Sequence, residues 1–407
     1  MTIKDWFKRV TKEVRIYRVP RSRYARGTEI SETEASTAIT SWQEGDLDAM
    51  FAIFNKMRTG DPHINATADT SILSVVNSSF TFTTDNPEKD EKQIQFLNQH
   101  LRPRIPIFAG QLAQAFLTGV MIAEIKWNLD GPWIIEKLIE APPAAFTWKE
   151  KTQEFVRVTE EGFESKTEEL DPLKTLVFTP QLIDGLPYGI LQSCINWFMF
   201  KDFAGNNWAS HTEIHGMPFR LGKYKPGATQ PEIDHLWEAV YSMGNDSAAV
   251  ISDNSMIELL EDKSGRKGAD IYKDLIEIAD MQISKAILGQ TSTTETIEKG
   301  NYYTAKNHAD VQRDRWISKL RLIEGWINTN IITPLIQLNL GIDDSTKIPR
   351  LVYNTETILD ALRLAQTAKI FYEMGSPIHP EDKKRAGLTV GDDEEPLVKS
   401  EGFKDLL

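Results

Sequence analysis

Residues 185–224 carry the strongest structural signal of the chain and read GLPYGILQSCINWFMFKDFAGNNWASHTEIHGMPFRLGKY. A Gly-Leu-Pro-Tyr-Gly turn precedes a proline-free run that predicts a helix over residues 190–213, roughly 36 Å long. Gly216 and Pro218 end this helix, and a short basic strand follows. Its apolar residues cover more than one face, so we expect the helix to be buried between neighbours. These residues are Leu191, Cys194, Ile195, Phe198, Met199, Phe203 and Trp208.

A second helix is predicted downstream, over residues 269–288, and ends at Gly289. Its apolar residues recur at helical spacing at Ile271, Leu275, Ile278, Ala279, Ile283 and Ile287. The intervening module predicts a strand (FRLGKY), a helix (PEIDHLWEAVYSM) and two more strands (AAVIS and MIELLED). The polar residues 290–301 predict a loop. A third helix is expected from Tyr302 to Pro334, where proline should end or kink it.

The N-terminal region of the chain predicts helices packed against an antiparallel sheet. Helical segments are expected within residues 28–60 and over 63–75 and 105–119, with a strand in SSFTFTTD between them. Five strand candidates then follow between residues 120 and 180: VMIAEIKWNL, PWIIEKLIEAP, AAFTWKEK, EFVRVTEEG and TLVFTP. Further on, RLVYN predicts a strand, residues 358–375 a helix, and residues 388–407 an acidic tail. The fold class is therefore α+β.

Composition indicates a soluble protein of two or three domains. The chain has 407 residues, of which 41% are hydrophobic and 26% are charged. No apolar run approaches the roughly 18 residues needed to span a bilayer, and the charged N-terminus does not resemble a signal peptide. The single cysteine, Cys194, excludes an internal disulfide framework and a cysteine-rich zinc site. We therefore expect a cytoplasmic protein without membrane association.

The net charge of −13 is unevenly distributed. Residues 1–26 carry a net charge of +7 from nine Lys or Arg against Asp5 and Glu13, which leaves −20 on the remainder. An acidic body argues against tight, sequence-independent DNA binding, which depends on basic side chains at phosphates. The basic segment has helical apolar spacing and predicts either an amphipathic helix packed on protein or an interaction arm.

None of the short motifs supports a catalytic, cofactor or metal site. The run His211–His215 reads H-x-E-x-H rather than the H-E-x-x-H of zinc proteases, and no third ligand is evident. LGKYKPG lacks the first glycine of a phosphate-binding loop. No Rossmann fingerprint or G-x-S-x-G elbow occurs, and the carboxylates are scattered. The aromatic residues of 197–208 have helical spacing that favours helix packing over base stacking.

Several runs in the same order resemble the Mu-like portal proteins of tailed bacteriophages. They are MRTGDPHINATADT with SILSVV, then LPYGIL, NWASHTEIHGMPFRLGKY, ADMQISKAILGQTSTTE and IFYEMGSPIHPEDKKRAGL. The resemblance implies a ring, commonly of twelve subunits, at one capsid vertex, through which viral DNA is packaged and ejected. An acidic body suits such a conduit, because firm contacts with phosphate would hinder sliding. No enzymatic activity is implied.

The resemblance also divides the chain into the segments of a portal fold. These are a basic N-terminal arm (1–27), a first wing segment (28–184), stem helix 1 (185–216), clip (217–268), stem helix 2 (269–289), tunnel loop (290–301), the long helix with a second wing segment (302–387), and an acidic tail (388–407). The chain ends soon after the PIHPED run, which implies a reduced crown.

Three groups of functional residues are implied by the same resemblance. The tunnel-loop residues expected to face DNA are Thr291, Ser292, Thr293, Thr294, Thr296, Lys299 and Asn301. The clip residues expected to dock partners are Arg220, Lys223, Tyr224, Lys225, Trp237, Lys263, Arg266 and Lys267. The residues expected to pack the stem are Trp197, Phe198, Phe203, Trp208, Leu275 and Ile283.

The implied partners are further copies of the chain, double-stranded DNA, the terminase large subunit, a head-completion or adaptor protein, and the major capsid and scaffold proteins. The implied location is the capsid vertex of the virion, and the host cytoplasm during assembly. Two alternatives stay open from sequence: another head-completion or connector protein, and a metal-dependent nucleic-acid enzyme.

Overall fold

The computed structural model describes residues 30–86, 90–161, 164–216, 220–225, 227–242, 248–252, 268–290, 302–355, 366–367 and 369–370. The chain divides into two units. The first holds Met1–Asn77 and Thr84–Pro349, and the second holds Ser78–Thr83 and Arg350–Leu407. The predicted N-terminal arm, the tunnel loop, the strand MIELLED, most of the helix 358–375 and the acidic tail lie outside the described residues.

The first unit begins with helices whose ends follow from the sequence. They are α2 (Glu32–Gln43), α3 (Asp48–Gly60), α4 (Pro62–Val76), α5 (Glu91–His100) and α6 (Ile105–Thr118). Asp61 caps α4 by accepting hydrogen bonds from the backbone N–H groups of His63 and Ile64. Pro62 follows the end of α3 and is the first residue of α4. Proline fits this position because the first turn of a helix does not need the N–H that proline lacks. Gly119 ends α6 in a left-handed conformation with φ 93°. The helices expected within residues 28–60 and over 63–75 and 105–119 are confirmed.

The strands form two sheets of three antiparallel strands rather than the single sheet that the sequence predicted. One has the order β3 (Ile134–Glu140), β2 (Met121–Asn128), β7 (Thr175–Phe178); the other has β4 (Phe146–Lys149), β5 (Glu154–Glu161), β6 (Glu164–Glu169). The prolines 142 and 143 separate β3 from β4, because proline cannot donate to a strand ladder. β6 was not expected, since its charged sequence lacks apolar alternation.

A largely shielded ion pair joins the two sheets. Arg157 of β5 donates to the carboxylate of Glu124 in β2, and both side chains are largely shielded from solvent. The guanidinium also lies 5.7 Å from the centre of the Phe146 ring. Glu124 faces the interior although it is charged, and this pairing explains how the sheet tolerates it.

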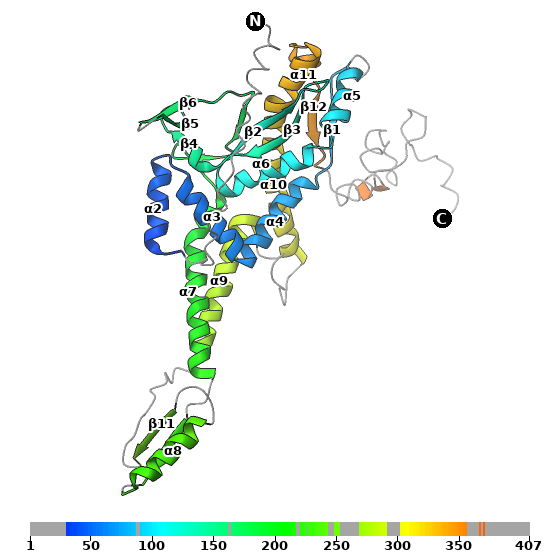
Figure 1. The fold of residues 1–407 in the computed structure, drawn as a ribbon. Coiled ribbons are helices and arrows are strands. Elements are labelled where there is room, and N and C mark those ends of the chain that lie inside the picture. The colour runs from blue at the N-terminus through cyan, green and yellow to red at the C-terminus, as the bar shows by residue number, and fades with distance from the viewer. Residues whose placement is uncertain are drawn as a thin grey trace, which may run out of the picture. The chain divides into compact units, whose positions relative to one another are not determined.

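Two long helices pack along each other in antiparallel fashion (Figure 1). They are α7 (Ile190–Gly216) and α9 (Gly268–Leu288), close to the predicted bounds. The first turns of α7 and the last turns of α9 enter the main hydrophobic core, where Leu191 and Phe198 meet Ile283 and Ile287. Burial raises the pKa of the Cys194 thiol to about 11, so this cysteine stays protonated at neutral pH. Among the described helices, none has the length and apolar character to cross a membrane.

The third long helix does not end at Pro334. α10 (Tyr302–Ile327) runs into a π-helical turn (Asn328–Ile332) and continues as α11 (Thr333–Leu340). The π turn shifts the hydrogen-bond pattern so that Pro334 lies in the first turn of α11, where no N–H is required. Asn339 then holds the first unit together by bonding both the N–H and the carbonyl of Trp133.

Lys319 of α10 lies half-buried between α4 and α6. Its ammonium is 2.5 Å from Ser71 Oγ and 5.6 Å from the centre of the Phe116 ring. Burial, aided by the neighbouring Arg315, lowers the pKa of Lys319 from 10.5 to about 8. The folded protein therefore releases this proton at a lower pH than the unfolded chain does.

We expect the contribution of Lys319 to the free energy of unfolding to rise between pH 8 and pH 10.5, because the unfolded chain binds more protons in that window. Lys319→Met should remove about 2 kcal/mol of this rise. Urea unfolding at pH 8 and at pH 10, in parent and variant, measures it. If the free energy of unfolding changes equally with pH in the parent and in Lys319→Met, Lys319 does not have the lowered pKa.

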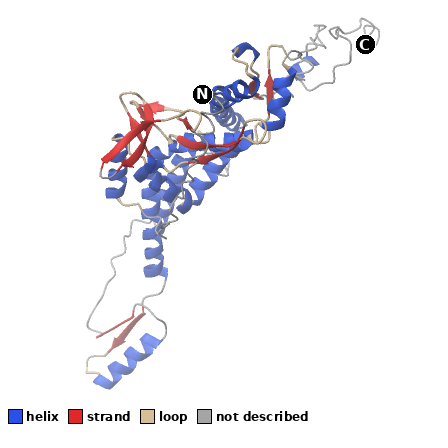
Figure 2. Cartoon of the chain, turned by 45° about the horizontal axis from the view of Figure 1, so that its top comes forward, coloured by secondary structure: helices blue, strands red, loops and turns tan. Residues whose placement is uncertain are grey.

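The small module between α7 and α9 is a βαβ unit. Strand β10 (Arg220–Tyr224) pairs in parallel with β11 (Ala248–Ser252), and α8 (Gln230–Ser242) connects them. Figure 2 shows the two strands lying along this helix. At the start of α8, the carboxylate of Glu232 accepts hydrogen bonds from the N–H and the hydroxyl of Thr229. The strands FRLGKY and AAVIS are thus confirmed.

The second unit contains an antiparallel strand pair. β1 (Phe80–Thr83) lies against β12 (Arg350–Tyr353), with Phe80 opposite Tyr353. The ring of Phe80 makes an edge-to-face contact with Tyr353 across the pair and another with Phe82 along its own strand. Both strands were expected from the sequence, from SSFTFTTD and RLVYN.

Candidate functional site on the paired long helices

The start of α7 is fixed by the turn that precedes it. The indole N–H of Trp148 donates to the carbonyl of Gly185 at 3.0 Å, and that of Trp42 donates to Pro187 at 3.0 Å. Gly189 lies directly against the end of α6, with no room for a side chain between the two backbones. The sequence GLPYG thus sets where the first long helix leaves the sheets and helices around it.

A partly buried charge cluster ties both long helices to α4. The ammonium of Lys201 in α7 lies 2.9 Å from Asp61 Oδ2 and 2.6 Å from Asp280 Oδ1 of α9. Asp61 is 3% exposed and is the N-cap of α4, so its carboxylate serves both contacts. His63, two residues further on, shares a 2.7 Å hydrogen bond with Ser284 of α9. These contacts fix the height of α9 relative to α7.

The pair presents two apolar faces to solvent, and helix geometry places them on opposite sides. Successive residues of a helix are about 100° apart, so Phe203, two residues after Lys201, points about 160° away from that lysine, which faces α9. Phe203 is 62% exposed and Phe200 is 50% exposed. On α9, where Asp280 faces α7, Ile271 is nine residues before it and so about 180° away. Ile271 is 55% exposed and Ile278 is 42% exposed.

The residues predicted to pack the stem fall into three groups. Phe198 and Ile283 are buried in the core of the single chain, and Trp197 and Leu275 are half-buried. Phe203 and Trp208 are exposed. The structure therefore brings some members of this set into the interior and leaves others on the surface. Four exposed apolar residues form the two solvent-facing sides of the pair: Phe200 and Phe203 on α7, and Ile271 and Ile278 on α9. We call these two sides the outer faces of the paired helices.

The residues predicted for the clip and the tunnel loop are only partly described. Arg220 lies in β10 and Trp237 in α8; Lys223 and Lys225 are exposed at the end of β10, beside the half-buried Tyr224. Lys263, Arg266 and Lys267 lie outside the described residues, as do all seven tunnel-loop residues. HTEIH occupies the last turns of α7, and the described side chains contain no group of three metal-ligating residues.

The sequence did not predict the charge cluster, nor which apolar residues of α7 and α9 stay exposed in a single chain. Asp61, Lys201 and Asp280 are separated by 140 and 79 residues, and nothing in their local spacing links them. The apolar repeat from Ile271 to Ile278 was visible, but such a repeat fits a core helix equally well. Only the exposed fractions of these side chains distinguish a core helix from one with an apolar face at the surface.

Comparisons with known proteins agree with this architecture. The family model of the portal protein of Mu bacteriophage matches residues 51–388. The portal protein of Escherichia phage Mu is 25% identical over 391 residues, which cover 92% of this chain and 75% of that protein. The Mu-like prophage FluMu protein gp29 of Haemophilus influenzae is 24% identical over 390 residues, covering 91% and 73%.

Solved structures show the same fold. A chain in the virion of a native gene transfer agent particle superimposes with a TM-score of 0.53 at 13% identity, covering 89% of this chain and 100% of that one. A chain in the neck of an empty particle of this kind gives 0.53 at 12% identity, covering 82% and 93%. The matches confirm the α+β portal fold, a structural role in the virion, and the function of a channel for viral DNA at a capsid vertex. The chain belongs to the family of Mu bacteriophage portal proteins.

Proposed function

We propose that copies of this chain close into the portal ring by packing the outer face of α7 in one copy against the outer face of α9 in the next. The observation that carries the proposal is that the two apolar faces lie on opposite sides of one helix pair. A head-to-tail contact repeated by rotation closes a ring, and it requires two different, complementary surfaces on each subunit. A two-fold dimer would need only one.

The charge cluster places the two faces at the same height. Lys201 contacts Asp280, and the helices are antiparallel, so Phe203 is level with Ile278. Subunits related by rotation about one axis stand at equal heights, so in a ring whose axis runs along the helix pair these side chains meet across the proposed interface. Burying an exposed phenylalanine or isoleucine contributes about 1.5–3 kcal/mol. Each contact recurs at every interface of the ring.

The exposed lysines at the end of β10 support a docking role for the small module. In a chain with a net charge of −13, Lys223 and Lys225 form a local basic site. We propose that it contacts the terminase large subunit during packaging and a head-completion or adaptor protein afterwards. The major capsid and scaffold proteins would contact other surfaces. Residues 290–301, which follow α9 after Gly289, would line the bore and touch double-stranded DNA in a ring of twelve copies.

Phe203→Asp and Ile278→Asp, made separately, should each raise the protein concentration needed for half-maximal ring formation at least about tenfold, because a carboxylate would be buried in an apolar contact. Sedimentation velocity and negative-stain images measure ring formation. Both side chains are exposed in the single chain, so the melting temperature should stay unchanged. Phe203→Leu is the matched control and should keep the ring.

A mixture of the two aspartate variants distinguishes head-to-tail packing from a two-fold contact. Each variant retains one intact face, so one copy of each can join through a single sound interface. We expect dimers in the mixture, monomers in each variant alone, and no closed rings. Normal rings from both variants would contradict the proposal.

A further inference from the structure

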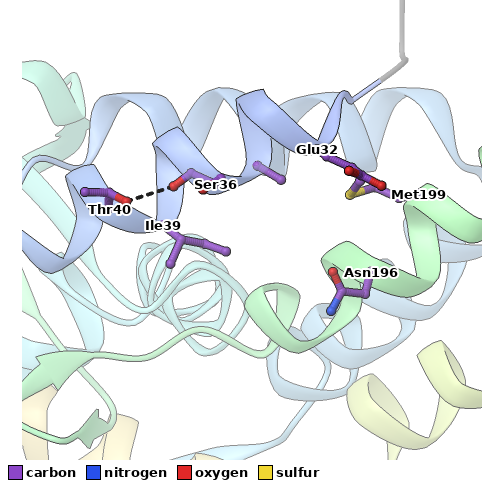
Figure 3. A pocket seen from close by; sticks show the side chains of 7 residues that line it. Glu32, Ser36, Ile39, Thr40, Asn196 and Met199 are labelled. Carbon is purple, nitrogen blue, oxygen red and sulfur yellow. Dashed lines mark hydrogen bonds between the residues drawn. The ribbon is translucent and has the colours of Figure 1, made fainter.

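A groove lies beside the outer face of α7, between that helix and α2. It has a volume of about 250 Å³ and is lined by Glu32, Ala35, Ser36, Ile39, Thr40, Asn196 and Met199. Figure 3 shows Asn196 and Met199 of α7 beside the α2 residues of the groove. Its apolar lining comes from Ala35, Ile39 and Met199, while Thr40 directs its hydroxyl to the carbonyl of Ser36. Glu32 supplies a carboxylate at the start of α2.

The groove is continuous with the proposed ring interface. Asn196 is four residues before Phe200 and seven before Phe203, so all three lie on the same side of α7. Toward the start of the helix, this side becomes a wall of the groove. A neighbouring copy seated on Phe203 would therefore extend along the groove as well.

The segment of the neighbour that reaches this height is the end of α9. Asn196 is five residues before Lys201, and Lys285 is five residues after Asp280, so Asn196 and Lys285 are level in the antiparallel pair. Lys285 is exposed and is seven residues after Ile278, which places it on the same outer face of α9. It is therefore the side chain that rotation about the ring axis brings opposite the groove.

The chemistry of the two surfaces also matches. A lysine has a long apolar stem with a cation at its tip, which suits an apolar groove with a carboxylate at its edge. Glu34, the other acid in the first turn of α2, is already paired with Lys56 at 2.7 Å. Glu32 is the acid that lines the groove.

We propose that Lys285 of each subunit enters the α2–α7 groove of its neighbour, with its stem against Ile39 and Met199 and its ammonium paired with Glu32. This inference rests on the ring proposed above and names a contact that fixes its register. It makes α2, which lies outside the stem helices, a contributor to the subunit interface.

Exchange of the two charges tests the contact. Glu32→Lys and Lys285→Glu should each raise the concentration needed for half-maximal ring formation about tenfold, because like charges would face each other. The double variant should assemble within about twofold of the parent. An equimolar mixture of the two single variants should also form rings, since alternating copies restore opposite charges at every interface. Glu44→Lys, an exposed reversal at the other end of α2, is the matched control and should assemble normally.

The outcomes separate this inference from the ring itself. Normal assembly of both single variants, or failure of both the mixture and the double variant to recover, would overturn the contact. If Phe203→Asp still blocks assembly in that case, the ring interface stands without the groove. If Phe203→Asp also assembles normally, the proposed interface fails as a whole. Circular dichroism should show unchanged folding throughout, because both charges are exposed in the single chain.

Discussion

Lys201→Met is expected to lower the free energy of unfolding of the first unit by about 3–5 kcal/mol. The substitution keeps the length and apolar stem of the side chain but removes its cation. Asp61 and Asp280 would then lose the ammonium that both of them contact, and Asp61 is almost entirely buried. Asp61 cannot turn to solvent without losing the cap of α4. Urea unfolding followed by tryptophan fluorescence measures the loss.

Two further variants show whether the cost arises from the unpaired carboxylates. Lys273→Met removes a lysine from the exposed Lys273–Glu277 pair on α9 and should cost less than about 0.5 kcal/mol. Adding Asp280→Asn to Lys201→Met should recover some of the loss, because one of the two unpaired charges is gone. Equal, small effects of the two lysine substitutions would show that the cluster does not stabilise the junction.

Most long elements of this chain could be predicted from sequence because their signals are local. Apolar spacing predicted α7 and α9, and the glycines at 119, 216 and 289 predicted helix ends close to the observed ones. The family resemblance, and with it the channel function, rested on runs of residues rather than on any catalytic motif. The comparisons with known proteins confirm it.

The features that could not be predicted depend on contacts between distant segments. The division into two sheets depends on which strands pair with β2 and which pair with β5, and the charged strand β6 pairs with β5. Pro334 is accommodated by a π turn that no local rule predicts. The outer faces share the apolar character of core residues, so their exposure emerges only once α7 and α9 are packed together. Sequence thus located the elements of the site but not which of their faces remain available.

Gly189→Ala should destabilise the first unit by about 3 kcal/mol, because the crossing of α6 and α7 has no space for a methyl group. A Cβ at this position would lie 2.5 Å from Gly119 N and Leu117 O, and closer still to the carbonyl carbon of Thr118. All three are backbone atoms, which cannot rotate away as a side chain could. The clash can therefore be relieved only if the first turn of α7 shifts away from α6. Thermal and urea unfolding measure the loss, and ring yield reports the shift.

Gly205→Ala provides a matched control within the same helix. A Cβ at Gly205 would meet nothing within 4 Å, so the same substitution should stabilise α7 by about 0.5–1 kcal/mol through its helix propensity. A loss of stability for Gly189→Ala and a gain for Gly205→Ala would show that the close approach of the α6 and α7 backbones requires glycine at position 189. Equal stability of Gly189→Ala and the parent would mean that α6 and α7 can separate freely. The outer faces would then not be held at a fixed position, and the register proposed for the ring would lose its structural basis.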